Sequence, residues 1–463
     1  MSWKKLGGTT LAFFVWAAQA SPEPYLSTYH AQSSAPVLIR NATVLDGTGR
    51  RLDGADVLIR DGKIVDVGTA LPQGDASTID AKGRGVTPGL IDVHSHLGVY
   101  ASPGVNATQD GNEMTDPVTA GVWAEHSVWP QDPGFATALA GGVTTIQILP
   151  GSGNLIGGRG VTLRNVPATT YQAMKFPGAL QGLKMACGEN PKRVYGERNQ
   201  APSTRMGNVA GYRQAFADAT DYQHQWQKHE AEVAAYDKKK AKDRDPAERP
   251  VPPKRDLRLE TLVAAMQGQV QVQVHCYRAD EMAVMLDLAQ EFHFKIAAFH
   301  HGVEAYKIAD RLAQEGVCGA LWADWWGFKL EAYDGIWENL AYVDAPKDGC
   351  AIVHSDSDEG IQRLNQEAAK AMSRGQRAGL DIPPERAIRW ITSNAAKALG
   401  IAGRVGTLEP GKMADVVVWN RDPFSVYALP DLVYIDGALA FDRNHPPATP
   451  RSDFLLGQPG VAR

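Results

Sequence analysis

Short runs in which apolar and polar residues alternate occur near both ends of the chain. Four of them lie close together at 37–40, 42–45, 56–60 and 63–67. Two more follow much later, at 414–419 and 432–437. Alternation with a period of two predicts strands that bury one face. We therefore expect residues 36–85 and 403–443 to build one small β-sandwich domain from both chain ends.

A different pattern fills residues 86–402, where short continuous apolar runs alternate with segments of helical periodicity. The apolar runs lie at 89–93, 144–149, 182–186, 270–274, 295–299, 319–322 and 351–353. Helical periodicity appears between several of them, as at 279–292 and 304–315. Repeated strand-then-helix order predicts an α/β protein with a parallel sheet, and eight such units close into a TIM-type (β/α)8 barrel. The eighth strand has no clear position, and glycine-rich residues 151–160 are interpreted as a tight-turn loop.

Residues 208–258 interrupt the barrel pattern. Residues 237–245 are almost all charged, and residues 248–254 are rich in proline. Because acidic residues are interspersed among the lysines, this composition predicts a solvated helical insertion and not a nucleic-acid-binding patch.

Composition and charge exclude several classes of protein. The chain has 463 residues, of which 44% are hydrophobic and 21% charged, and its formal net charge is -5. This balance is that of a globular protein and excludes a general nucleic-acid partner. After residue 20, no uninterrupted apolar stretch reaches the length of about 18 residues that a membrane span needs. The sequence is compatible with a homo-oligomer.

The first twenty residues have the layout of a secretory signal peptide. Lys4 and Lys5 give a positive start, residues 11–18 are largely apolar, and Ala18-Gln19-Ala20 is a cleavage site of small residues. We therefore expect the protein to be exported, to the periplasm or outside the cell.

Cysteine is scarce in this chain. Its four cysteines each sit in an apolar or glycine-flanked run: Cys187, Cys276, Cys318 and Cys350. Buried free thiols are therefore the expectation, and a bridge between Cys318 and Cys350 is left open.

Candidate metal ligands stand at the ends of the predicted barrel strands. His94 and His96 directly follow an apolar strand and, being two residues apart, point to the same side, where they can share a metal ion. His275, His301 and Asp356 follow three other strands. In β/α barrels these carboxyl ends meet at one face, which carries the active site. An isolated histidine is more often a core residue, but convergence from four strands favours a metal centre.

Four motifs resemble those of the amidohydrolase superfamily of metal-dependent hydrolases. They lie at 86–96 (VTPGLIDVHSH), 142–145 (GVTT), 391–400 (ITSNAAKALG) and 406–419 (GTLEPGKMADVVVW). The resemblance covers about residues 36–443. Within the superfamily the chain is most similar to the imidazolonepropionase-like branch, which includes prolidase-like enzymes. Residues 150–159 and 182–196 resemble one subgroup of that branch.

The resemblance implies a role for each of these residues. His94 and His96 would bind the more buried of two divalent metals, most simply zinc, and His275 and His301 the second. Asp356 would contact the first metal and act as general base. The family usually has glutamate before its His-Gly step, where this chain has His300. His354 and Asp358 are candidates to orient the ligands.

The ligand that bridges the two metals is left open between two residues. Lys184 matches the lysine that carries a CO2-derived carboxylate in related enzymes, and an unmodified ammonium has only donors and is no ligand. Glu189 offers a carboxylate without modification. The sequence favours Lys184, because it lies inside a predicted strand.

Cationic and aromatic residues in the loops after the strands are candidates to bind substrate. Among them are Arg193, Tyr195, Tyr277 and Arg278, together with Arg205, Trp325, Trp326 and Lys329. The expected activity is hydrolysis of an amide-type C–N bond, in a non-standard peptide or an N-acyl compound, by metal-activated hydroxide. A deaminase or cyclic amide hydrolase with a single metal is one alternative, and a non-catalytic binding protein on the same scaffold is another.

Overall fold

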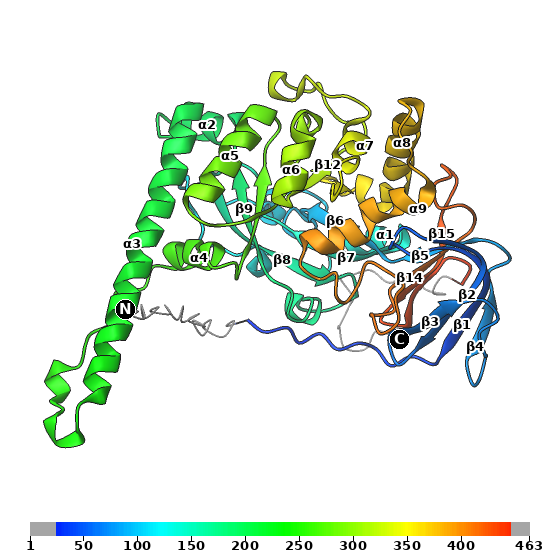
Figure 1. Ribbon diagram of the computed structural model, residues 1–463, viewed down its shortest axis with the longest axis horizontal. Coiled ribbons are helices and arrows are strands. Elements are labelled where there is room, and N and C mark those ends of the chain that lie inside the picture. Colours follow the sequence, from blue (N-terminus) through cyan, green and yellow to red (C-terminus); the bar gives the residue numbers. More distant parts are fainter. Residues whose placement is uncertain (1–24, 446–463) are drawn as a thin grey trace, which may run out of the picture.

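The computed structural model describes residues 25–445, so the predicted signal peptide lies outside the described residues (Figure 1). Strands from both chain ends lie side by side in one sheet, as the sequence predicts. The N-terminal strands are β1 (Val37–Leu45), β2 (Arg51–Arg60), β3 (Lys63–Gly68), β4 (Ser77–Asp80) and β5 (Gly85–Pro88). The C-terminal strands are β14 (Val416–Trp419), β15 (Pro430–Ile435) and β16 (Ala438–Asp442).

The eight strands of this small domain form one connected sheet in the order β16-β15-β14-β5-β1-β2-β3, and β4 also pairs with β1. The two chain ends meet where β14 pairs antiparallel with β5, with Val417 opposite Thr87. The turn between β2 and β3 contains Asp61 and Gly62, both with positive φ. Two such residues in succession are typical of the tight hairpin turn that matches the twist of antiparallel strands.

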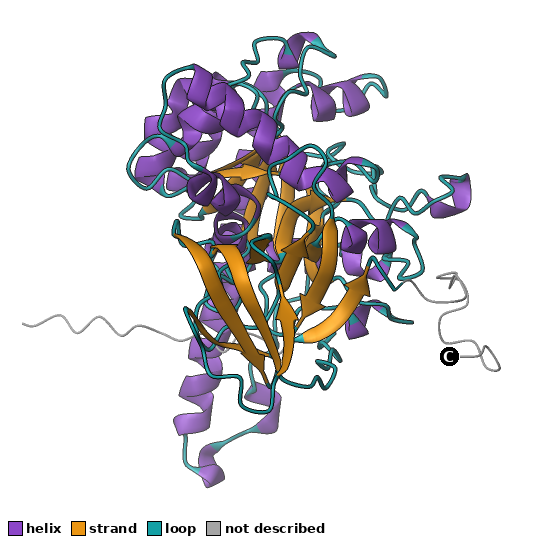
Figure 2. Ribbon diagram, turned by 90° about the vertical axis from the view of Figure 1, so that its right-hand side faces the viewer, coloured by secondary structure: helices purple, strands orange, loops and turns teal. Residues whose placement is uncertain are grey.

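The second sheet is the barrel, with eight strands in the order β13-β12-β11-β10-β9-β8-β7-β6. They are β6 (Leu90–Ser95), β7 (Val143–Ile148), β8 (Ile156–Arg164), β9 (Gly182–Ala186), β10 (Gln271–His275), β11 (Ile296–His300), β12 (Cys318–Leu321) and β13 (Ala351–Val353). The two edges meet beyond β6 and β13, where the Asp356 N–H donates to the His94 carbonyl at 3.0 Å. In Figure 2 the strands lie in the middle of the molecule, and helices lie mainly above and beside them.

The prediction of a tight-turn loop at residues 151–160 is wrong for its second half. Residues 156–164 form the barrel strand β8. This strand runs antiparallel to both neighbours, β7 and β9, whereas the remaining pairs in the barrel are parallel. The barrel therefore replaces one of its expected strand–helix units by a hairpin.

Helices cover the outside of the barrel. They are α1 (Gly134–Ala140), α2 (Glu189–Gly196), α3 (Arg205–Lys238), α4 (Leu257–Met266), α5 (Ala279–Glu291), α6 (Ala309–Glu315), α7 (Asn339–Asp344), α8 (Leu364–Arg377), α9 (Pro384–Ala387) and α10 (Ser393–Ala398). Among residues 25–445, none of these helices combines the length and apolar character needed to cross a membrane.

The predicted charged insertion corresponds to α3 and the segment after it. The first half of α3 packs on the barrel, where Phe216 stacks on Phe294 with ring centroids 4.5 Å apart. The second half is mostly solvent-exposed and extends away from the barrel (Figure 1). Because water surrounds most of the second half of α3, its sequence is polar on all sides.

A buried ion cluster joins the barrel to the small domain. Arg164 at the end of β8 is fully buried, and its guanidinium contacts Asp415 at 2.5 Å and Asp436 at 3.1 Å. Both carboxylates belong to the C-terminal part of the small domain, so the cluster fixes the two sheets together.

The cysteines do not remain free thiols, contrary to the expectation. Cys187 is bonded to Cys276, and Cys318 is bonded to Cys350. The first disulfide joins the residues directly after β9 and β10, and the second joins β12 to the start of β13. Each disulfide therefore ties two neighbouring barrel strands to each other.

Candidate active site

His94, His96 and Asp356 meet at the carboxyl end of the barrel. The Nε2 atoms of His94 and His96 lie 3.4 and 3.2 Å from Asp356 Oδ1. Asp356 has a φ of 50°, and its N–H donates to the His94 carbonyl, so the loop after β13 turns its carboxylate toward β6. The predicted histidine pair and carboxylate thus face one common point.

Hydrogen bonds on the far side of each imidazole select its tautomer. His96 Nδ1 lies 2.8 Å from the Leu149 carbonyl, which only accepts, so Nδ1 carries the proton and Nε2 is free. His300 Nε2 lies 2.8 Å from Gln273 Oε1, so it donates and leaves Nδ1 as an acceptor. His94 Nδ1, 2.9 Å from His300 Nδ1, then donates, and His94 Nε2 is also free. Both proton-free nitrogens face Asp356, as metal ligation requires.

This chain of contacts accounts for the unusual residue at position 300. His300 is fully buried, and burial holds its pKa well below the usual range, so the ring is neutral and can relay the hydrogen bond. His300 therefore orients His94 through the nitrogen that lies opposite the Asp356 side of the His94 ring.

Lys184 lies in the middle of β9 beside these ligands. Its side chain is fully buried, and its Nζ lies 3.4 Å from His94 Nε2 and donates to the Pro150 carbonyl at 3.0 Å. Burial lowers the pKa of Lys184 to about 7, because no water solvates the ammonium. The position and the lowered pKa both suit an amine that reacts with CO2.

Glu189 lies farther out, at the first residue of α2. Its carboxylate is 3.3 Å from Lys329 Nζ, and its N–H donates to Glu331 at 3.0 Å. The next residue along the helix, Asn190, approaches His275. Of the two candidates for the bridging ligand, Lys184 is the one whose contacts join it to His94.

His275 and His301 complete the cluster. Their ring centroids are 4.8 Å apart, and that of His301 is 4.4 Å from that of His94. His301 Nδ1 lies 3.8 Å from Asp356 Oδ2. Burial is the main reason that the pKa values of His275 and His301 lie well below the usual range, so both rings are neutral.

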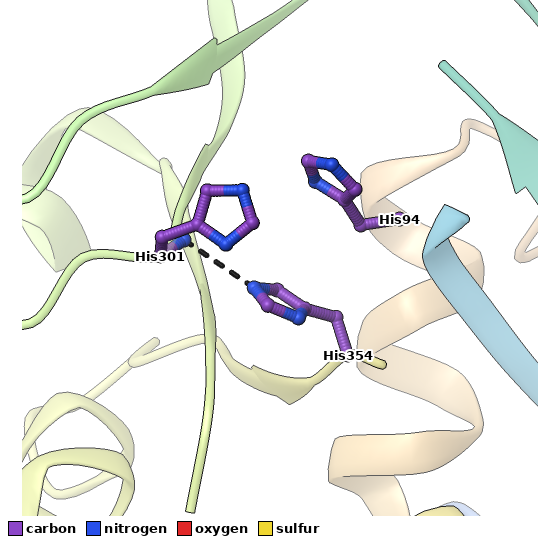
Figure 3. Close-up of side chains that lie close together, drawn as sticks. All are labelled: His94, His301 and His354. Carbon is purple, nitrogen blue, oxygen red and sulfur yellow. Dashed lines mark hydrogen bonds between the residues drawn. The ribbon is translucent and has the colours of Figure 1, made fainter. Parts of the chain in front are cut away.

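His354 is a member of the cluster that the sequence offered only as an orienting residue. One nitrogen from each of His94, His301 and His354 lies within 4.8 Å of the other two (Figure 3). The His301 N–H donates to His354 Nε2 at 3.3 Å. Burial lowers the pKa of His354 to about 4, so it too is uncharged at neutral pH.

The strand ends that carry these groups are held by Asp92. This buried carboxylate accepts hydrogen bonds from the N–H groups of His94 and Ser355 at 3.2 Å, and from the Ser355 hydroxyl. It therefore ties the end of β6 to the residue before Asp356.

Four of the residues predicted to bind substrate are separated by the structure. The Tyr277 ring lies 4.6 Å from the His275 ring, beside the cluster. Arg278 forms an ion pair with Asp280 at 2.9 Å. Arg193 is exposed on α2, where it lines an open hollow together with Glu189.

Tyr195, the fourth of these residues, is fully buried on the other side of α2. Its hydroxyl donates to the Asp116 carbonyl at 2.7 Å and accepts from Asn154 at 3.0 Å. Its contacts therefore support the loops and do not reach the histidines.

Several site residues were not found from the sequence. Trp322 stacks near His301, with centroids 4.4 Å apart, and Asn190 Nδ2 lies 3.4 Å from His275 Nε2. Trp322 directly follows β12, so the strand-end rule that found the histidines also applies to it. Gln273 lies inside β10, where no sequence signal separates it from a core residue.

The comparisons with known proteins identify the family of this chain. An amidohydrolase from Thermotoga maritima of known structure is 35% identical, with a TM-score of 0.76, and the match covers 88% of this chain and 100% of that one. The chain belongs to the amidohydrolase family. The model of the Amidohydrolase family itself also matches residues 348–441.

Two curated proteins are also similar to this amidohydrolase in sequence. Amidohydrolase tasK of Hapsidospora irregularis is 33% identical over 444 residues, which are 88% of this chain and 43% of that protein. A dihydroorotase of Syntrophotalea carbinolica is 42% identical over 85 residues, 18% of this chain and 19% of that protein. The chain thus spans less than half the length of these curated relatives. The narrower imidazolonepropionase-like branch stays a prediction.

The donor set of this amidohydrolase fits a divalent metal centre. The Nδ1 atoms of His275, His301 and His354 are buried and lack a hydrogen-bond partner among the described residues. Unpaired buried polar atoms are rare, because each costs about 1–3 kcal/mol in lost solvation. Neutral imidazoles grouped around a carboxylate are the ligands that zinc and similar cations prefer.

Proposed function

We propose that this amidohydrolase cleaves an amide-type C–N bond, in a non-standard peptide or an N-acyl compound, with the help of two zinc ions. One observation carries the proposal: the proton-free Nε2 atoms of His94 and His96 converge with Asp356 Oδ1 within 3.4 Å. Two imidazoles held in their metal-binding tautomers beside a carboxylate, at a barrel mouth, are the arrangement of a catalytic metal centre.

The remaining donors would hold a second ion. His94, His96 and Asp356 would bind the first cation, and His275 and His301 the second. A carboxylated Lys184, next to His94 Nε2, would supply the oxygen bridge. When bound, divalent cations lower the pKa of water toward neutrality and polarise a carbonyl group.

The protein groups then handle protons and position. The Asp356 side chain is 22% exposed, so it faces the mouth and can reach both water and substrate. It would accept a proton from the attacking water and later give it to the leaving amine. The aromatic rings of Tyr277 and Trp322 would limit the entry of bulk water around the histidines.

The test joins metal analysis to a substrate screen of the purified protein. Two cations per chain together with hydrolysis of dipeptides or N-acyl amino acids would support the proposal. One cation together with deamination or opening of a cyclic amide would favour the single-metal alternative. Bound metal without turnover of any amide would point to a binding protein.

We also propose that the protein is exported, in line with the signal-like residues 1–20. The two disulfides support this, because structural disulfides persist mainly in oxidising compartments. Cell fractionation with N-terminal sequencing of the mature chain tests it, and a cytoplasmic protein that retains Met1 would contradict it.

A further inference from the structure

The cationic side chains near the mouth of the barrel differ in the groups that they contact. Arg205 contacts Glu281 at 3.1 Å and Glu331 at 2.6 Å, so its guanidinium is already paired with two carboxylates. Arg278 is paired with Asp280, as described above. Neither arginine contacts a histidine of the cluster among the interactions of residues 25–445.

Lys329 is placed differently, because both of its supports contact His275. Its Nζ lies 4.4 Å from the centroid of Tyr277, whose ring packs on His275. The same Nζ donates to Asn190 Oδ1 at 2.9 Å, and Asn190 Nδ2 lies 3.4 Å from His275 Nε2. One aromatic ring and one amide therefore separate this ammonium from a candidate metal ligand.

An apolar wall stands beside Lys329. Trp322 packs on His301, and Trp325 packs on Trp322 with centroids 4.8 Å apart. Phe328 lies 5.8 Å from Trp325. Trp325 is 46% exposed and Phe328 is 49% exposed. Large exposed aromatic rings next to a polar site are typical of a surface that binds a ligand.

We propose that Lys329 binds the carboxylate of the substrate and that Trp325 and Phe328 contact its apolar side chain. The substrate class is then N-acyl amino acids or short peptides with a free carboxylate one residue from the scissile amide and an apolar side chain. This inference rests on the proposed amide hydrolysis and names the specificity of the same site.

Glu189 occupies the position that the substrate carboxylate would take. Its carboxylate lies 3.3 Å from Lys329 Nζ, and both side chains are partly exposed, at 27% and 20%. A partly exposed ion pair is weak and exchanges partners readily. Glu189 thus holds the ammonium in place before substrate binds and competes with the substrate afterwards.

The experiment compares each acid with its amide. The substrates are N-acetyl-phenylalanine and N-acetyl-leucine, each beside its C-terminal amide, and the readout is kcat/KM. Loss of a charge-assisted hydrogen bond costs about 1.5–3 kcal/mol, which is roughly a 10- to 100-fold effect. Lys329→Met is expected to lower kcat/KM for the acids by that factor and to lower it much less for the amides. Arg278→Met is the matched control and should keep the preference for the acids.

Two further variants sharpen the result. Glu189→Gln should lower KM for the acids several-fold without changing metal content, because it removes the competing anion. A Lys329→Met enzyme that keeps its preference, or loses acids and amides equally, would overturn the inference. Loss of the preference for acids in Arg193→Met, with the preference kept in Lys329→Met, would also overturn the inference.

Calorimetric binding separates failure of this inference from failure of the proposed function. If the metal-loaded protein hydrolyses none of these compounds but binds the acids more tightly than the amides, and only with Lys329 present, the function is wrong and the carboxylate site stands. If neither acid binds more tightly than its amide, the carboxylate site is wrong.

Discussion

The lowered pKa of Lys184 makes a quantitative prediction about its carboxylation. Only a neutral amine reacts with CO2. With its ordinary pKa of 10.5, a lysine is about 0.3% neutral at pH 8, whereas with a pKa of about 7 it is about 90% neutral. Burial therefore raises the reactive fraction roughly 300-fold. Because acidification through pH 7 protonates the amine, occupancy of the carbamate should fall as the pH drops below 7.

The assay follows the added carbon directly. The metal-free protein is incubated with 13C-bicarbonate and then loaded with zinc, and the carbamate carbon is detected by NMR at pH 8 and pH 6. Lys184→Met should abolish the signal and reduce bound zinc from two ions to at most one. Lys397→Met, which changes an exposed lysine on α10, is the control and should retain both.

A Lys184→Met protein that still binds two zinc ions, without any carbamate signal in the parent protein, would remove Lys184 from the bridge. Glu189 would then be the bridging ligand, and Glu189→Gln would be expected to lose one zinc ion. That result would contradict the structure, in which Glu189 pairs with Lys329.

Three further perturbations address the base, the domain contact and the disulfide. Asp356→Asn should retain most of its metal by elemental analysis but lower kcat roughly 10²- to 10⁴-fold, because the amide accepts no proton; an unchanged kcat would exclude Asp356 as the base. Arg164→Met leaves Asp415 buried without its partner, so denaturant titration should show a loss of about 3–5 kcal/mol, and a loss below about 1 kcal/mol would contradict this role. Replacing Cys187 and Cys276, which are 89 residues apart, by serine removes their bond and leaves the other disulfide, and it should cost up to about 4 kcal/mol and lower the Tm; an unchanged Tm would show that the bond adds no stability.

Most of the fold followed from hydrophobic periodicity, and the exception has a physical cause. Strand β8 contains Gly157, Gly158 and Gly160, a composition that disfavours strands and favours turns. In the structure, a Cβ at Gly158 would overlap the backbone of Val122, and one at Gly160 would overlap that of Ile148. The glycines are present because neighbouring backbone approaches β8 closely, and that contact is not visible in a single sequence.

The candidate site was predictable where one rule applied and unpredictable elsewhere. His94 lies near the end of β6, His96 and Asp356 come after β6 and β13, and the carboxyl ends of barrel strands meet. Which loop residues turn inward depends on packing: Tyr195 supports a neighbouring loop, whereas Tyr277 reaches the cluster. The relay from Gln273 through His300 depends on tertiary contacts alone.

The sheet that strands from both chain ends build together would be left open by a truncation of the chain. Until β14 has been synthesised, β5 keeps one row of backbone groups unpaired, and an open edge of this kind promotes association between chains. A product cut between the barrel and β14 would keep every histidine of the cluster and still expose that edge. Loss of the segment from β14 onward should therefore cause aggregation before it lowers the enzymatic activity.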